Sequence, residues 1–314
     1  MTMMFQEKVS VGLFLLVILS IYGFEAIWLA RLAWKRIRRR EKKNVRHRKS
    51  VLFVHVLAAA GVMCMLYGYL VEPVWLDVRR VTIPTAKLKG SSVRIVHISD
   101  LHCDRKARNE ARMVDIVNGF HPDVVVATGD YLNDPAALPR LHETLGGLKA
   151  PLGKFAIEGN FEVWHWPGLD MLEGTGFRLL RQDSVLVAKG ADEIGISGLS
   201  IDRAADCQGL LAGLSDDRFN VLLFHTPDLV EDVNALGVDL YLCGHTHGGQ
   251  VALPFYGALV TFSKFGKKYE SGLHRCGRTT LYVNRGLGLE PCPAPQVRFC
   301  ARPEIVVFDI VPEK

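Results

Sequence analysis

Five short polar clusters between residues 100 and 247 carry residue types that bind metal ions. They read Asp100-Leu-His102, Gly129-Asp130, Gly159-Asn160, His225 and Gly244-His245-Thr-His247. Oxygen and imidazole ligands without thiolates suit Mn, Fe, Zn, Ni or Co better than Ca or Mg. Two such metals, about 3.5–4 Å apart, can clamp a phosphoryl group and share an activated hydroxide for in-line attack. The clusters therefore predict hydrolysis of a phosphate ester or anhydride with two divalent metal ions as cofactors.

Each cluster follows a short apolar run that is typical of a buried strand. The runs are RIVHIS before Asp100, VVVAT before Gly129, FAIE before Gly159, VLLF before His225 and LYLC before Gly244. In open α/β sheets the ligand crevice lies outside the carboxyl ends of the strands. We therefore expect the five clusters to form one site, with Asp130 as the bridging carboxylate.

Apolar runs and amphipathic segments alternate from residue 93 onward. Strands are expected at 93–98, 123–127, 154–157, 185–188, 194–199, 221–224, 239–242, 280–283 and 305–310, and helices at 105–119, 135–148, 206–214 and 227–236. This interleaving, followed by a strand-rich C-terminal third, is typical of an α/β layered domain. We expect a catalytic domain at residues 93–314, preceded by a linker at 72–92.

Residues 1–71 have the pattern of a transmembrane helical hairpin. Two apolar stretches, at 9–30 and 51–71, are each long enough to cross a bilayer as a helix. The basic loop between them, 31–50, belongs in the cytoplasm by the positive-inside rule, so the catalytic domain is expected on the other side. A secretory signal is the alternative for the first stretch, but no basic cluster precedes that stretch and a second span follows it. Glu25, within the first span, is expected to snorkel or to pair locally.

The positive net charge of the chain belongs to this N-terminal segment. Residues 1–50 hold 12 Lys and Arg against 3 Asp and Glu, whereas the rest of the chain holds 26 against 30. A catalytic domain with this balance is not expected to bind nucleic acid. The seven cysteines do not identify the cellular compartment. Cys292 and Cys300 would be close enough to form a disulfide if the chain turned at Pro293 and Pro295. The oligomeric state stays open as well.

The ordered clusters resemble the calcineurin-like metallophosphoesterase superfamily, whose pattern D-x-H, GD, GN, H and GHxH covers residues 93–250. Further runs are similar to its membrane-anchored bacterial branch of the YkuE/YaeI type: EPVWLDVRRVTIP at 72–84, HTPD at 225–228, GHTHGGQVALP at 244–254, NRGLG at 284–288 and RFCARPEI at 298–305. The resemblance implies a four-layer αββα sandwich in an integral protein of a bacterial inner or plasma membrane.

The resemblance also implies a division of the ligands between two metals. Asp100, His102 and His247 would hold one metal, and Asn160, His225 and His245 would hold the other, with Asp130 bridging the two. On this basis Asp130 and Asn160 are candidate catalytic residues as well as ligands.

Phe161 departs from the family pattern, in which a His after GN protonates the leaving group. Phenylalanine cannot donate a proton, and three interpretations stay open. His165 is a candidate replacement acid, although a surface histidine without a role is an equal alternative. The leaving group could need no proton, as in a phosphoanhydride, or activity could be reduced or lost. General acid help is worth about 10²–10⁴ in rate, so its loss still leaves a metal-driven hydrolase.

Three functions compete on this evidence. The leading one is a membrane-anchored two-metal phosphohydrolase of a phosphodiester or phosphoanhydride that is plausibly lipid-linked. Aromatic side chains are candidates to flank the lipid at Trp164, Trp166, Phe255, Tyr256 and Phe262, and core or interface packing is the alternative for each of them. The alternative enzyme is a UDP-2,3-diacylglucosamine pyrophosphatase of lipid A synthesis, whose substrate lies on the cytoplasmic side. The non-enzyme alternative is a membrane scaffold that only holds metal and binds anionic lipid through its basic loop.

Overall fold

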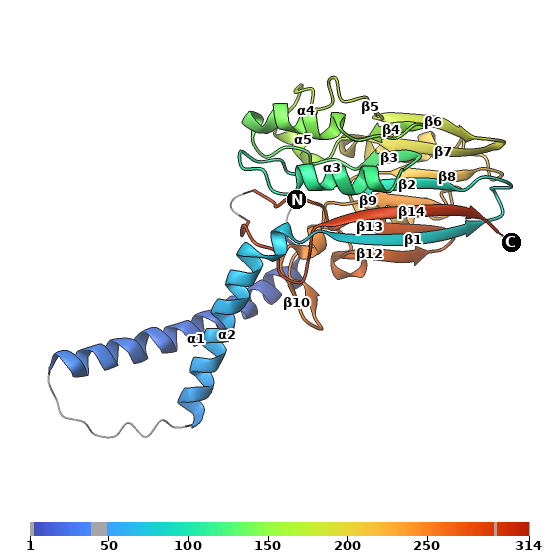
Figure 1. Ribbon diagram of the computed structural model, residues 1–314. Helices are drawn as coiled ribbons and strands as arrows, with labels where there is room; N and C mark the ends of the chain where they lie inside the picture. Colours follow the sequence, from blue (N-terminus) through green and yellow to red (C-terminus); the bar gives the residue numbers. More distant parts are fainter. Residues whose placement is uncertain (1–2, 39–48, 292–293, 314) are drawn as a thin grey trace.

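The computed structural model describes residues 3–38, 49–291 and 294–313, and two stacked β-sheets form the centre of its catalytic domain (Figure 1). The first sheet has the order β1-β14-β2-β3-β4-β5 and the second the order β12-β13-β9-β8-β7-β6. The strands of the first sheet are β1 (Asp77–Thr85), β2 (Val93–Ile98), β3 (Val124–Ala127), β4 (Gly153–Ala156), β5 (Phe177–Leu179) and β14 (Glu304–Pro312). Those of the second are β6 (Gln182–Lys189), β7 (Asp192–Leu199), β8 (Phe219–Leu223), β9 (Leu240–Cys243), β12 (Gly272–Cys276) and β13 (Thr279–Val283).

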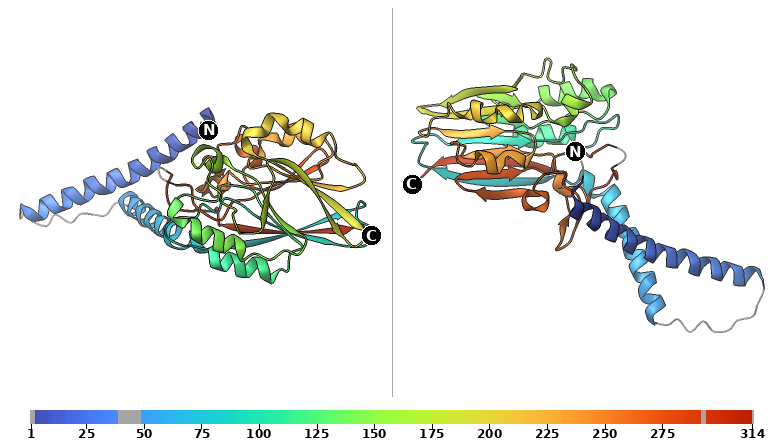
Figure 2. Two further views of the ribbon diagram at one scale, coloured as in Figure 1. Left: turned by 90° about the horizontal axis from the view of Figure 1, so that it is seen from above. Right: turned by 180° about the vertical axis from the view of Figure 1, so that it is seen from behind.

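Helices cover the outer face of each sheet, so the expected four-layer αββα sandwich is confirmed (Figure 2). The first sheet carries α3 (Glu110–Gly119) and α4 (Leu138–Gly146), and the second carries α6 (Cys207–Leu211) and α7 (Val230–Val233). Between the sheets, strand residues such as Ile95, Val126, Val221 and Leu242 pack in one buried cluster. This core fixes the strand ends, and with them the loops that follow.

Two further short elements lie beside the site. Helix α5 (Asn160–Trp164) begins directly after β4 and the loop 157–159. The small hairpin of β10 (Ala252–Leu253) and β11 (Gly257–Ala258) projects from the domain on the side where the N-terminal helices meet it (Figure 1).

The two N-terminal helices form the expected hairpin, and both are long and apolar enough to cross a membrane. Helix α1 (Phe5–Ile37) extends beyond the predicted span into the predicted basic loop, of which residues 39–48 lie outside the described residues. Helix α2 (Lys49–Leu70) returns to the catalytic domain. Glu25 pairs with His55 of the other span, with Oε1 2.7 Å from Nδ1, rather than with a neighbour on its own helix.

Both ends of this hairpin attach to the catalytic domain. The Glu7 carboxylate accepts hydrogen bonds from the Thr261 N–H at 2.7 Å and the Thr261 hydroxyl at 2.8 Å. The carbonyl of Gly68 accepts a bond from the N–H of Arg298 at 2.9 Å. The start of α1 and the end of α2 therefore both lie against the catalytic domain, at the same end of the hairpin.

The predicted linker 72–92 is wrong where it crosses residues 77–85, because these residues form strand β1, which pairs in parallel with β14. The strand is half exposed and contains Pro84, which lacks an N–H donor and is tolerated only at a sheet edge or bulge. Apolar and polar residues alternate only weakly along β1, so the sequence did not reveal this strand. Strands β5 and β12 were not predicted either.

The helix predicted at 105–119 begins only at Glu110. The preceding loop has other partners: Asn109 donates a hydrogen bond to the Pro73 carbonyl at 2.8 Å, and the Arg105 guanidinium binds the Asp134 carboxylate at 2.6 Å. The suggested bridge between Cys292 and Cys300 cannot be described, since residue 292 lies outside the described residues.

Candidate metal centre

The carboxyl ends of five strands from both sheets meet at one edge of the sandwich. Asp100 and His102 follow β2, Asp130 follows β3, and Asn160 follows β4, all in the first sheet. His225 follows β8, and His245 and His247 follow β9, in the second sheet. All seven predicted ligands are buried, and the structure brings their side chains together at these strand ends.

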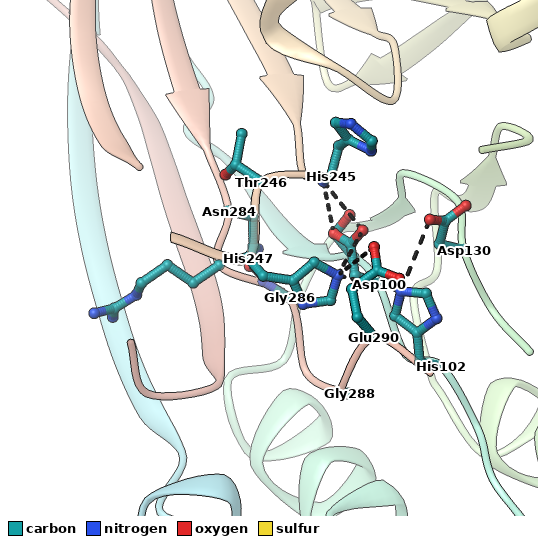
Figure 3. A network of polar contacts seen from close by, with 12 residues as sticks. Asp100, His102, Asp130, His245, Thr246, His247, Asn284, Gly286, Gly288 and Glu290 are labelled. Carbon is teal, nitrogen blue, oxygen red and sulfur yellow. Dashed lines mark hydrogen bonds and ion pairs between the residues drawn. The ribbon is translucent and has the colours of Figure 1, made fainter. Parts of the chain in front are cut away.

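The first group of side chains is Asp100, His102 and His247 (Figure 3). The Nε2 atoms of the two histidines are 3.2 Å apart, and Nε2 of His247 is 3.6 Å from Oδ1 of Asp100. One ligand atom from each of the three residues lies within 4.8 Å of the other two, which is close enough to surround a single ion.

The second group is Asp130, His225 and His245, with one ligand atom of each again within 4.8 Å of the others. Oδ2 of Asp130 is 3.2 Å from Nε2 of His225 and also 3.7 Å from Nε2 of His102 in the first group. Oδ1 of Asn160 is 3.1 Å from Nε2 of His225. Asp130 thus stands between the groups, where a bridging ligand must be.

The backbone at five of these residues adopts the left-handed conformation that non-glycine residues rarely visit. Asp100, His102, Asp130, His245 and His247 have φ between 41° and 71°. Residues in sparsely populated backbone regions cost of the order of 1–3 kcal/mol each and cluster at functional sites. This strain at five candidate ligands supports a function for them together.

Glycine permits the close packing of these loops. A Cβ at Gly159 would overlap Oδ1 of Asp130, and a Cβ at Gly244 would overlap Oδ2 of Asp100. Neither of these two glycines has positive φ, so their backbone conformation does not itself require glycine. The requirement at Gly159 and Gly244 is close approach.

Hydrogen bonds behind the site orient its imidazoles. Nδ1 of His225 donates to the carbonyl of Thr128 at 2.6 Å, and Nδ1 of His102 donates to the Asn133 amide oxygen at 2.7 Å. In both rings this leaves Nε2 as the atom that faces the site. Partners of this kind fix the ring orientation of metal-ligating histidines.

Burial and charge set the ionisation of the group. Burial lowers the pKa of His102 to about 4 and the pKa of His245 to about 3, so both imidazoles keep a free lone pair at neutral pH. Burial opposes the charged form of His225, yet the carboxylates of Asp130 and Asp100 raise its pKa to about 10. Burial alone would raise the pKa of Asp130, but the neighbouring imidazoles of His225 and His102 hold it below its ordinary value. The site thus favours a positive charge between its carboxylates.

The donor set fits divalent metal ions. Among the described residues, Oδ2 of Asp130 and both ring nitrogens of His245 are buried without a hydrogen-bond partner. Buried polar atoms are nearly always satisfied, so such atoms call for an explanation. A cation between them would satisfy the inward-facing atoms, and mixed carboxylate, amide and imidazole ligands suit the transition metals that the sequence predicted.

Phe161 lies against the first group. Its ring makes an edge contact with the ring of His102 at 4.8 Å between centroids, and its other neighbour is His165, also at 4.8 Å. The exposed His165 ring is therefore separated from His102 by an apolar ring. A cavity of about 440 Å³ opens here, lined by Asn160, Phe161, His165, His245, Phe262 and Glu290 among others. The candidate acid His165 lines this cavity together with the candidate ligands Asn160 and His245.

Three residues near the centre were not predicted from the sequence. The Glu162 carboxylate accepts bonds from the N–H groups of Gly159 and Asp130, both at 2.8 Å, and of Tyr131 at 2.9 Å. It therefore ties the GN and GD turns together. The acid two residues after Asn160 was the available signal, but its backbone partners come from a distant turn.

Glu290 and Arg298 come from the C-terminal part of the chain. Glu290 forms a third group with His102 and Asp130 in which the ligand atoms lie within 4.8 Å of one another, and its Oε1 is 3.9 Å from Nε2 of His247. The fully buried Arg298 lies with its Nη2 3.1 Å from Nδ1 of His247 and donates to the carbonyl of Gly288. Arg298 belongs to the RFCARPEI run, but nothing in that run indicates its distance from the histidine.

Fold and site together define a metal-dependent hydrolase of phosphoric esters or anhydrides. The chain belongs to the calcineurin-like phosphoesterase family, whose model matches residues 93–249.

Three relatives span most of this chain. It is 34% identical to the uncharacterized metallophosphoesterase YkuE of Bacillus subtilis, over 78% of this chain and 89% of YkuE. It is 27% identical to the phosphodiesterase YaeI of Escherichia coli, over 82% of this chain and 98% of YaeI. It is 25% identical to the UDP-2,3-diacylglucosamine pyrophosphatase LpxG of Chlamydia trachomatis, over 80% of this chain and 94% of LpxG. Each of these similarities therefore extends beyond the residues of the family match.

Proposed function

We propose that this chain is a membrane-anchored phosphohydrolase that uses two metals to cleave a phosphodiester or phosphoanhydride bond of a lipid-linked substrate, with its site outside the cytoplasm. The observation that carries the two-metal part is the position of Asp130, whose Oδ2 lies between an imidazole of each group. Asp100, His102 and His247 would hold one ion, and Asn160, His225 and His245 the other.

The residues around the metals have separate tasks. Divalent metals at such a site polarise phosphoryl oxygens and lower the pKa of water. Asp130 and Asn160 hold the geometry at the junction of the groups, and Glu162 fixes their turns. Phe161 excludes water beside His102 and supplies no proton, which favours substrates whose leaving group is stable as an anion.

The membrane and lipid parts rest on the hairpin and on the cavity. Helix α1 begins and helix α2 ends against the catalytic domain, and the cavity wall includes apolar side chains at Phe161, Trp164 and Phe262. An apolar wall beside a polar centre suits a substrate with a phosphate and an acyl chain. LpxG, a relative, is named for such a lipid-linked substrate.

Turnover with defined metals tests the proposed function. The purified full chain, stripped with a chelator and reloaded with Mn²⁺, should hydrolyse bis-p-nitrophenyl phosphate or a UDP-linked lipid, and the stripped chain should not. Binding of metal without turnover of either substrate would contradict the hydrolase and favour the scaffold.

The alternative substrate is UDP-2,3-diacylglucosamine, which both Phe161 and the similarity to LpxG favour. This substrate lies on the cytoplasmic side of the membrane, so its hydrolysis requires the catalytic domain on that side. A C-terminal alkaline phosphatase fusion, active only outside the cytoplasm, distinguishes the two: an active fusion supports our orientation, and an inactive one with an active cytoplasmic reporter moves the alternative ahead.

A further inference from the structure

The segment from Leu253 to Lys268, which we call the 253–268 loop, exposes aromatic side chains beside the membrane helices. Phe255, at the tip of the β10–β11 hairpin, is fully exposed at 110% of its reference area, and Tyr256 and Phe262 are exposed at 45% and 37%. Single exposed apolar residues need no explanation, but several on one loop mark an interaction site.

Contacts with α1 fix the level of this loop relative to the membrane. The Tyr256 hydroxyl is hydrogen-bonded to the hydroxyl of Ser10, the second residue of the apolar run 9–30. The Thr261 backbone and side chain bind Glu7, one turn earlier on the same helix. The 253–268 loop thus lies where the first span enters the hydrocarbon region.

Contacts of the second span, α2, independently place the same face of the domain next to the membrane. Gly68, close to the end of the apolar run 51–71, is bound to the N–H of Arg298, and the ring of Tyr67 packs against Phe299 with 6.2 Å between centroids. The bridge between Val251 and Phe299 joins this attachment to the start of the β10–β11 hairpin. Two helices therefore hold the same face of the domain at the bilayer surface, and in two views the hairpin projects on that side (Figures 1 and 2).

The chemistry of the loop matches a lipid surface. The Lys267 ammonium lies 4.0 Å from the centre of the Tyr256 ring, and those of Lys264 and Lys268 lie 4.9 and 5.9 Å from the centre of the Phe265 ring. All three lysines are at least 39% exposed, and each is paired with a carboxylate, that of Asp232, Glu270 or Glu231. Aromatic rings beside lysines at the end of an apolar span are typical of the membrane–water interface.

We propose that the 253–268 loop is a third membrane contact, in which Phe255 enters the acyl region and the rings of Tyr256 and Phe262 lie at the membrane–water interface. Phe262 belongs both to this loop and to the wall of the 440 Å³ cavity. The proposed contact is therefore continuous with the wall of this cavity. This inference rests on the membrane anchoring in the proposed function, but not on the reaction.

Photo-crosslinking in a bilayer tests the contact directly. The full chain in nanodiscs of phosphatidylcholine and phosphatidylglycerol carries the photoreactive residue benzoylphenylalanine in place of Phe255, of Leu16 on α1, or of Leu186 on β6. Leu16 and Leu186 are exposed at 61% and 57%, so all three positions accept the replacement without disturbing the core. Mass spectrometry then identifies acyl-chain adducts at each position.

We expect lipid adducts at positions 255 and 16 and several-fold fewer at position 186. Adducts at position 16 with only the Leu186 level at position 255 would overturn this inference and leave the anchor intact. A lack of adducts at both positions 16 and 255 would overturn the anchor itself, and the third contact with it.

Discussion

Asp130 connects the two halves of the site at the scale of single residues. Its Oδ2 is 3.7 Å from an imidazole of the first group and 3.2 Å from one of the second, and its Oδ1 accepts a bond from the Phe161 N–H at 2.9 Å. Loss of its charge therefore affects both groups at once, whereas loss of any terminal ligand affects one.

Asp130→Asn should lower both metal content and turnover. Changing an outer-shell partner typically costs about 10–100-fold, and a bridging ligand should cost more. Metal analysis and hydrolysis of bis-p-nitrophenyl phosphate measure the two effects. Asp309→Asn, which removes a surface pair with Arg94, is the control that should leave both unchanged. Undiminished turnover in Asp130→Asn would remove the bridging role.

Phe161→His should raise turnover of diesters with poor leaving groups. A proton donor there is worth up to about 10²–10⁴ in rate, and the gain should shrink as the leaving group becomes more acidic. Rates over a series of aryl and alkyl diesters give this dependence.

His165→Ala is the matched control for that substitution. Because the Phe161 ring separates His165 from His102, the variant should keep the wild-type dependence on the leaving group. No gain in Phe161→His, together with a loss in His165→Ala that is selective for poor leaving groups, would show that His165 already serves as the acid.

Glu162→Gln should destabilise the fold around the site. The carboxylate accepts three backbone N–H bonds, and an amide nitrogen cannot accept, so at least one buried N–H loses its partner at a cost of about 1–3 kcal/mol. Denaturant unfolding measures the change. Glu158→Gln removes an exposed pair with Arg181 and should cost less than about 1 kcal/mol. Equal stability of the two variants would refute the role of Glu162.

At the scale of elements, the strand ends that carry the ligands were predictable and their surroundings were not. The strands before Asp100, Asp130 and His225 are mainly apolar and almost wholly buried, so burial on both faces made them visible. The edge strand β1 lacks that signal, and its Pro84 argues against a strand. Glu290 reaches the site from a loop after β13, a contact between distant parts of the chain that local pattern cannot reveal.

The attachment of α1 to the catalytic domain is an element-scale feature that the sequence did not indicate. Glu7→Ala should release the start of α1 from Thr261 and increase amide hydrogen exchange at residues 259–263, since the Thr261 N–H loses its acceptor. Gln6→Ala changes the neighbouring exposed residue and should have no such effect. Unchanged exchange in Glu7→Ala would contradict the attachment.

At the scale of the whole molecule, charge and hydropathy divide the chain into an anchor and a catalytic sandwich, and the contacts at Glu7 and Gly68 join them. The composition of the first 50 residues predicted this division. The direction in which the cavity opens depends on how the sandwich sits on the hairpin, which only the folded chain defines.

The central claim is that the two ligand groups hold two metal ions joined by Asp130. Titration of the metal-free full chain with Mn²⁺, followed by electron paramagnetic resonance, tests it most directly. We predict two bound ions for each chain and the spectrum of a magnetically coupled pair, which Asp130→Asn abolishes. One ion for each chain, or two that remain uncoupled, would contradict the account.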